Sequence, residues 1–153
     1  MENTIDAFYK AFNNLDAETM VSYYHDDVIF KDPAFGTLKG HQAKNMWRML
    51  CQSQQGQNFK ITAYNITNNS ATWEAFYTFS KTKRKIHNTV NAKFVFKDGK
   101  IIAHTDTFNL YKWSKQALGF KGILIGWTPY FKAQLQQQTN KLLHQFQQKQ
   151  KLN

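Results

Sequence analysis

Hydrophobic residues recur at helical spacing in four parts of the chain. Near the start, intervals of three and four residues place a single apolar stripe on a helix, made of Ile5, Phe8, Tyr9 and Phe12. The same spacing predicts a short helix over 17–24 and a longer one over 41–52, with Trp47 on its apolar face. A last helix is predicted over 129–148, because Thr128-Pro129 joins a capping residue to a proline suited to the first turn.

Between these helices the period of the pattern changes to two, which predicts β-strands. The alternating segments are 28–32, 59–64, 71–80, 87–97 and 100–113. After them, residues 114–118 are expected to form one helical turn and residues 122–126 a loose apolar segment.

Asp98-Gly99 is the strongest hairpin signal in the sequence, because the pair suits a two-residue turn with positive φ angles. Such a turn pairs Lys97 with Lys100. Counting back along the strands from that pair puts Asn91 opposite Asp106.

The order of the predicted elements is helices, then antiparallel strands, then one helix. This order predicts an α+β fold in which helices pack on one face of a curved sheet. No internal repeat or linker divides the chain, and its length suits one hydrophobic core, so we expect a single domain over 1–153.

The predicted register sorts the last two long strands into an apolar face and a mixed face. The mixed face combines polar and aromatic side chains, among them Asn91, His104, Asp106 and Phe108. It suits a concave ligand-binding surface and equally a hydrated dimer interface. Asp106 and Asp32 each lie on an otherwise apolar strand, and a carboxylate is rarely buried without a hydrogen bond, an ion pair or a chemical task. The two aspartates therefore indicate a pocket with polar groups at its floor.

Composition narrows the class of protein. Hydrophobic residues make up 42% of the chain, and 13 Phe, seven Tyr and four Trp exclude a disordered protein. The single cysteine, Cys51, excludes an intrachain disulfide framework and a cysteine-based zinc site. No apolar run is long enough to span a bilayer, and the first residues lack a signal-peptide pattern, so we expect a cytoplasmic protein without membrane partners.

The formal charge of +10 raises the question of nucleic-acid binding. Lysines are spread over nearly every segment, and the one dense run, 81–85, falls between two strands, where a solvated hairpin tip explains it. No phosphate-binding loop or nucleic-acid-binding motif accompanies the run, so nucleic acid is disfavoured as a partner. His104 and Asp106 lack a third ligand at a suitable spacing, so no metal is expected.

Taken in order, these segments resemble the SnoaL-like branch of the nuclear transport factor 2-like superfamily, which includes ketosteroid isomerases, polyketide cyclases and limonene-epoxide hydrolases. The resemblance covers nearly the whole chain, and a closing Gly-Trp-Thr-Pro resembles a separate subgroup of that branch. It rests on Phe8–Phe12, Tyr24–Val28, Phe30–Pro33, Phe35-Gly36, Gly40, Met46-Trp47, Phe96–Ile101, Asp106, Leu118-Gly119 and Gly126–Pro129.

The resemblance implies a cone-shaped sheet around a pocket capped by the N-terminal helices, and dimers formed through the sheet. It places Asp106 where cyclases and epoxide hydrolases carry an acid or base carboxylate, and Asp32 near the region of the ketosteroid isomerase base. The hydrolases also need a second Asp and an Arg on the preceding strand, where this chain has Asn91 and Thr89, so that relay is incomplete.

Two classes of function follow. The first is a cofactor-free isomerase, cyclase or hydrolase acting on a small hydrophobic molecule; the second is a non-catalytic binding or dimeric interaction module. In the first, Asp106, His104 and Asp32 are the catalytic candidates, and desolvation of Asp106 competes with a hydrogen bond from Asn91. The remaining ligand-binding candidates are Tyr24 as a hydroxyl donor and Trp47, Trp73 and Phe108 as pocket walls.

Overall fold

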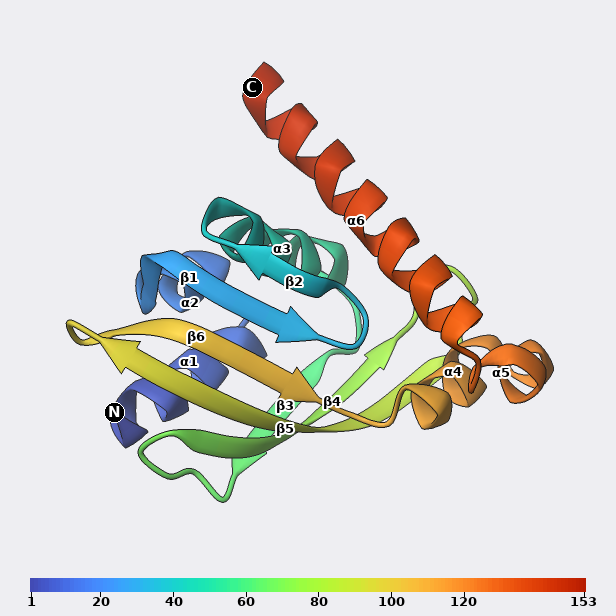
Figure 1. Ribbon diagram of the computed structural model, residues 1–153, viewed down its shortest axis with the longest axis horizontal. Helices are drawn as coiled ribbons and strands as arrows, with labels where there is room; N and C mark the ends of the chain where they lie inside the picture. Colours follow the sequence, from blue (N-terminus) through green and yellow to red (C-terminus); the bar gives the residue numbers. More distant parts are fainter.

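A computed structural model describes residues 1–153. Six strands form one curved sheet in the order β2-β1-β6-β5-β4-β3 (Figure 1). Their bounds are β1 Tyr24–Asp32, β2 Gly36–Lys39, β3 Lys60–Tyr64, β4 Ser70–Thr78, β5 Lys85–Lys97 and β6 Lys100–Thr107. All neighbouring strands are antiparallel except β1 and β6, which run parallel and join the N-terminal hairpin to the rest of the sheet.

Helices pack on the face of the sheet that carries the core, which confirms the predicted α+β fold (Figure 1). Three of them come from the N-terminal third: α1 Glu2–Asn13, α2 Ala17–Ser22 and α3 His41–Gln54. The C-terminal part adds α4 Leu110–Leu118, α5 Phe120–Ile125 and the long α6 Pro129–Leu152, whose far end projects beyond the sheet.

The predicted starts of α2 and α6 are confirmed by side-chain caps, whereas α1 begins at Glu2 without one. The α1 stripe is buried as its spacing requires. Asp16 caps α2 by accepting a hydrogen bond from the Thr19 N–H, and Thr128 caps α6 by accepting one from the Phe131 N–H. The helix α2 is shorter than predicted, because the chain turns into β1 at Tyr24 rather than at Val28.

The hairpin turn is also confirmed, but the register beyond it differs from the prediction. Asp98 and Gly99 both have positive φ, and Lys97 pairs with Lys100. Farther along, Phe96 pairs with Ile101 while Val95 pairs with Ala103, so Ile102 is an extra residue in β6. This is a β-bulge, a local insertion that no pattern of alternation reveals.

The bulge changes the partners and the face of every later residue in β6. Ala92 pairs with Asp106, and Asn91 pairs with Thr107, so the predicted pairing of Asn91 with Asp106 is wrong. His104 and Asp106 do share a face, as predicted, but they share it with the buried Phe94 and not with Asn91.

The predicted strand over 100–113 is too long. It ends at Thr107, and Asn109 then caps α4 by accepting a hydrogen bond from the Lys112 N–H. Trp113 and Ala117, four residues apart, are buried on the inner side of α4. Residues 122–126, expected to be loose, belong mostly to α5.

The core consists of a large cluster and a small one. The large cluster holds 25 buried residues between the sheet and α1–α3, with Phe8, Phe30 and Trp47 almost completely enclosed. The small cluster lies under α4 and α6 and contains Ile86, Trp113, Ala117 and Phe131. None of the helices has an apolar stretch of the length and hydropathy needed to cross a membrane.

Candidate functional site

Two aspartates distant in sequence lie on neighbouring strands of the sheet. In the parallel β1–β6 pair, Phe30 lies beside His104 and Lys31 beside Thr105, and Asp32 and Asp106 are the residues that follow in the two strands. Adjacent strands are about 4.8 Å apart, and side chains two residues apart share a face. Phe30 and His104 point into the core, and the two carboxyl groups therefore point to that same side.

A chain of buried hydrogen bonds leads to Asp106. The Trp47 indole N–H donates to the Tyr24 hydroxyl at 2.8 Å, and that hydroxyl lies 2.7 Å from Nδ1 of His104. Nε2 of His104 lies 2.9 Å from Oδ1 of Asp106. Because an indole can only donate, the Tyr24 oxygen accepts, and its own proton is directed to Nδ1. Nε2 then carries the ring proton, and this N–H donates a hydrogen bond to Asp106.

His104 is completely buried among aromatic rings, and both of its nitrogens are engaged. The Trp47 ring stacks on it with centroids 5.9 Å apart, and Phe94 packs at 4.3 Å. Phe30 meets it edge-on at 5.2 Å. With no free ring nitrogen, His104 orients Asp106 and cannot itself take a proton from a ligand in this arrangement.

Asp106 is 3% exposed and receives its hydrogen bonds on one oxygen. Oδ1 accepts from His104, and the Trp73 indole N–H donates to the same oxygen over a longer 3.4 Å. The hydrogen-bond donors to Asp106 are thus His104 and Trp73, and not the Asn91 amide predicted from the sequence. Their hydrogen bonds offset part of the free energy lost when the carboxylate is removed from water.

Asp32 closes the turn that follows β1. Its Oδ1 accepts hydrogen bonds from the backbone N–H groups of Ala34 and Phe35, at 2.9 and 2.6 Å. Burial raises the pKa of Asp32 to about 7; the Phe35 N–H opposes this rise, and the charge of Asp106 adds to it. Near neutral pH the Asp32 carboxyl is therefore close to half protonated.

Two tyrosines near the carboxyl pair were not singled out from the sequence. The Tyr9 hydroxyl is buried without a hydrogen-bond partner, and burial, followed by the charge of Asp106, raises its pKa well above the usual value. The Tyr77 hydroxyl accepts from the Trp113 indole at 2.7 Å. Burial raises the pKa of Tyr77 to about 12, with an opposing effect of Trp113 and a further rise from Asp32. The sequence signal for Tyr9 was its place in the apolar stripe of α1, which predicts that its hydroxyl is buried.

The structure brings together most of the predicted site residues. Tyr24, Trp47, Trp73, His104, Asp106 and Asp32 lie around the hydrogen-bond chain and the carboxyl pair. Asn91 is separate: it is exposed, and its side chain accepts from the Thr72 hydroxyl at 3.1 Å. Phe108 follows the end of β6 and packs, partly buried, against both clusters of the core.

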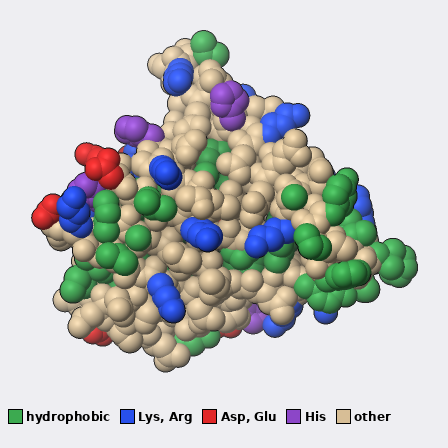
Figure 2. All heavy atoms as spheres, viewed as in Figure 1, with side chains coloured by type: hydrophobic (Ala, Val, Ile, Leu, Met, Phe, Trp, Pro, Cys, Tyr) green, Lys and Arg blue, Asp and Glu red, His purple; other side chains and the backbone are tan.

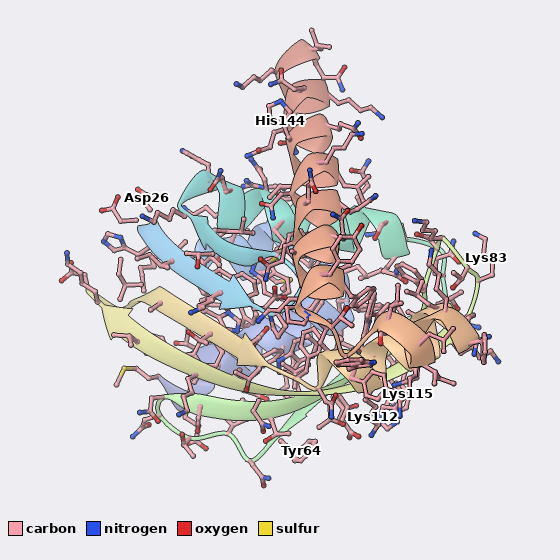
Figure 3. All side chains as sticks on the ribbon, turned by 45° about the vertical axis from the view of Figure 1, so that its right-hand side comes forward. Asp26, Tyr64, Lys83, Lys112, Lys115 and His144 are labelled. Carbon is pink, nitrogen blue, oxygen red and sulfur yellow. The ribbon has the colours of Figure 1, made fainter.

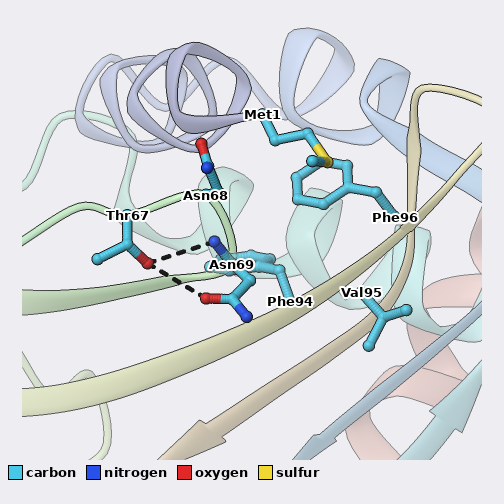
Figure 4. A pocket seen from close by; sticks show the side chains of 7 residues that line it. All are labelled: Met1, Thr67, Asn68, Asn69, Phe94, Val95 and Phe96. Atoms are coloured by element: carbon cyan, nitrogen blue, oxygen red, sulfur yellow. Dashed lines mark hydrogen bonds between the residues drawn. The ribbon is translucent and has the colours of Figure 1, made fainter.

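Two hollows on the molecule lie away from the carboxyl pair. One of about 640 Å³ is bounded by Met1, the 67–69 turn and the 94–96 segment of β5 (Figure 4). Another of about 370 Å³ lies between the start of α2, the end of α3 and α6. Close to the pair the interior is occupied by aromatic rings. No group of three or more His, Cys, Asp or Glu side chains is placed to hold a metal ion.

Comparison with solved structures shows the same fold in proteins of low sequence identity. An epoxide hydrolase of the limonene-epoxide hydrolase type from Mycobacterium tuberculosis aligns with a TM-score of 0.55 and 22% identity, over 81% of this chain and 89% of its own. A ketosteroid isomerase-like protein from Catenulispora acidiphila, in complex with trimethylamine, aligns with 0.57 and 17%, over 82% and 97%. A nuclear transport factor 2-like protein of unknown function from Burkholderia pseudomallei aligns with 0.60 and 14%, over 76% and 96%.

No protein with a curated description matches the sequence. The family model for the SnoaL-like domain matches residues 5–104, which include most of α1, the whole of β1 and every member of the hydrogen-bond chain except Asp106. The chain therefore belongs to the SnoaL-like domain family and has the nuclear transport factor 2-like fold that its sequence resembled.

Proposed function

We propose that the protein catalyses proton transfer on a small hydrophobic molecule without a cofactor, using Asp32 and Asp106 as a pair. The observation that carries the proposal is the register of β1 and β6, in which Asp32 and Asp106 directly follow the paired residues Lys31 and Thr105. A carboxyl with a pKa of about 7 both takes up and releases a proton readily near neutral pH, which suits general acid–base catalysis.

In this mechanism Asp32 removes a proton from a carbon next to a carbonyl group. The electron pair of the broken C–H bond moves into the carbonyl, and negative charge develops on the carbonyl oxygen. The Tyr9 hydroxyl, which has no partner in the protein, is the candidate donor to that oxygen. Return of the proton from Asp32 to another carbon completes an isomerisation, and burial, with a smaller contribution from the charge of Asp106, keeps the pKa of Asp32 raised.

His104 and Tyr24 have positioning roles in this proposal. The Tyr24 hydroxyl holds the His104 ring, and His104 binds Oδ1 of Asp106. The second oxygen of Asp106 has no hydrogen bond from this chain of residues. Trp47 and Trp73 hold the two ends of the chain and form its apolar surroundings.

The ligand is proposed to enter on the Asp32 side, beneath α6. Three side chains of α6 hold the turn after β1: Gln136, Thr139 and Asn140 donate to the backbone carbonyls of residues 33–35 at 3.2, 2.8 and 2.9 Å. Only Phe131 and Leu143 of this long helix are fully buried. Entry of a ligand here requires this part of α6 to move away from the turn, which breaks these three hydrogen bonds.

The test is turnover of a panel of enolisable ketones and epoxides by the parent protein and by Asp32→Asn and Asp106→Asn. Loss of a general acid or base lowers kcat by about 10²–10⁴-fold, and both variants are expected to show it. Asp98→Asn is the matched control, because Asp98 lies exposed in the hairpin turn, where asparagine tolerates the positive φ. Equal turnover by Asp32→Asn and the parent would exclude the proposed base.

The aromatic filling around His104 favours a second candidate, a non-catalytic binding module. In that case the hydrogen-bond chain specifies the core and the ligand is only held. Ligands from the same panel would then raise the melting temperature without being converted, and Asp32→Asn would leave their affinity unchanged.

We also propose that two copies associate through the convex face of the sheet. Ile29, Ala103 and Val95 form a row across β1, β6 and β5, and the outer residues of the row, Ile29 and Val95, are 44% and 58% exposed. Light scattering at micromolar concentration tests this: the expected mass is that of a dimer, and Val95→Lys should give the monomer.

A further inference from the structure

A compact apolar patch stands on the opposite end of the molecule from the N-terminus. We define it as the exposed side chains of α5 and the residues that follow it: Phe120, Ile123, Leu124, Trp127 and Tyr130. Each is between 48% and 75% exposed. Figure 2 shows hydrophobic side chains gathered at the end of the molecule where Figure 1 places α5. Five large apolar residues together in such a short segment are more than the scattered exposure of ordinary surfaces.

The fold holds this patch outward by a close backbone contact on the other side of α5. Gly122 and Gly126 are both buried against Ser114 of α4. A Cβ at Gly122 would lie 2.1 Å from the Ser114 carbonyl oxygen, and one at Gly126 would lie 1.8 Å from the Ser114 hydroxyl. Only glycine permits this approach, so the face of α5 that carries side chains is turned to solvent.

Hydrogen bonds fix the patch further. The Tyr111 hydroxyl donates to the Ile123 carbonyl at 3.0 Å, and the Trp127 indole donates to the Leu124 carbonyl at 3.2 Å. The patch is therefore a preformed surface, and binding to it requires little ordering of the chain.

Charge around the patch is entirely of one sign. After Asp106 the chain contains seven lysines and no Asp, Glu or Arg, so this C-terminal part carries +7 of the net charge of +10. Lys112 and Lys115 on α4, Lys121 on α5 and Lys132 on α6 are exposed. Figure 3 shows Lys112 and Lys115 on the outer side of α4, next to α5.

We propose that this patch docks the protein on the surface of an anionic lipid bilayer. The apolar side chains would enter the boundary between headgroups and acyl chains, where Trp and Tyr are favoured, while the lysines contact anionic headgroups. This proposal departs from the expectation of no membrane partner, which rested on the lack of a spanning segment; adsorption to a bilayer surface needs no such segment.

The charge and size of the patch argue against a second copy as its occupant. Two copies facing each other through this patch would bring lysines against lysines with no carboxylate among them. A stable dimer also needs about 20–30 residues on each side, and the patch has only five large apolar ones.

Sedimentation of the full chain with vesicles tests the proposal. We expect binding to phosphatidylcholine vesicles that contain phosphatidylserine, weak binding to phosphatidylcholine alone, and release by salt. The double variant Leu124→Gln/Trp127→Gln should lose at least tenfold in partitioning, on the order of what burial of two large apolar side chains contributes. Leu142→Gln, which removes a comparably exposed apolar side chain of α6 outside the patch, should bind as the parent does.

A second pair of variants tests the charges without touching the apolar side chains. Lys115→Gln and Lys121→Gln should each reduce binding about fivefold, as expected for a lysine close to an anionic surface. The proposal is overturned if the parent does not bind, if it binds both vesicle types equally, or if Leu124→Gln/Trp127→Gln binds as tightly as the parent. It is also overturned if sedimentation velocity shows that the double variant dissociates a dimer, which would identify a second copy as the occupant.

Discussion

Replacing Asp32 by asparagine is expected to stabilise the protein at neutral and alkaline pH. Burial raises the pKa of Asp32 from 3.8 to about 7 in the folded state, with a contribution from Asp106. At a pH between these two pKa values, the folded chain keeps a proton on Asp32 that the unfolded chain has released. The free energy of unfolding therefore falls as pH rises from about 4 to about 7. The asparagine side chain does not titrate, and the variant should lack this part of the decline.

The size of the effect follows from the same two pKa values. One pKa unit corresponds to about 1.4 kcal/mol, so the full difference is worth about 4 kcal/mol above neutral pH. Asp32 keeps partial contact with water, and screening reduces the expected gain to about 2–3 kcal/mol. The asparagine oxygen can still accept the Ala34 and Phe35 N–H bonds, so the turn itself should persist.

Urea unfolding of the parent, Asp32→Asn and Asp98→Asn across this pH range provides the measurement. Acidic groups that do not interact with Asp32 titrate equally in parent and variant, so the difference between the two unfolding free energies reports Asp32 together with its interaction with Asp106. That difference should be small near pH 4, grow through the acidic range and level off above neutrality. If the two curves stay parallel over the whole range, the pKa of Asp32 is not raised and the proposed base loses its basis.

Two further substitutions probe the buried chain and the close helix contact. Tyr24→Phe leaves the Trp47 N–H and Nδ1 of His104 without partners, and we expect a loss of about 2–4 kcal/mol of unfolding free energy in urea, with part of it recovered when Trp47 is also changed to Phe. Gly122→Ala places a methyl group against the Ser114 carbonyl. We expect a drop of several degrees in melting temperature and weaker vesicle binding. An unchanged melting temperature would contradict the close contact.

Local signals in the sequence were sufficient for most of the architecture. The apolar stripe of α1, the Thr128-Pro129 start of α6 and the Asp98-Gly99 turn each depend on neighbouring residues, and the structure confirms them. The end of β6 was missed for the opposite reason. Phe108 and Leu110 continue the apolar alternation, and the Asn109 cap reveals that a helix begins there.

The candidate site depended on features that are not local. Resemblance to the family pointed to Asp32 and Asp106 individually, but their adjacency follows from the parallel pairing of β1 with β6, which no turn signal announces. Tyr9 was assigned to an apolar stripe because its ring is apolar; its unpartnered hydroxyl becomes visible only when α1 is packed against the sheet.

The extra residue at Ile102 acts as a phase shift in β6. Upstream of it, between the turn and Ile101, residues face as simple alternation dictates; downstream, odd and even positions exchange sides. Deletion of Ile102 would remove the bulge and leave His104 opposite Phe94 and Asp106 opposite Ala92, still facing the core. Regular pairing of the strand with Ile102 retained, opposite Val95, would instead turn His104 and Asp106 outward and direct Thr105 and Thr107 into the core. Alignments of related chains should therefore be anchored on both sides of the bulge, since a gap misplaced by one position would assign the wrong residues to the interior.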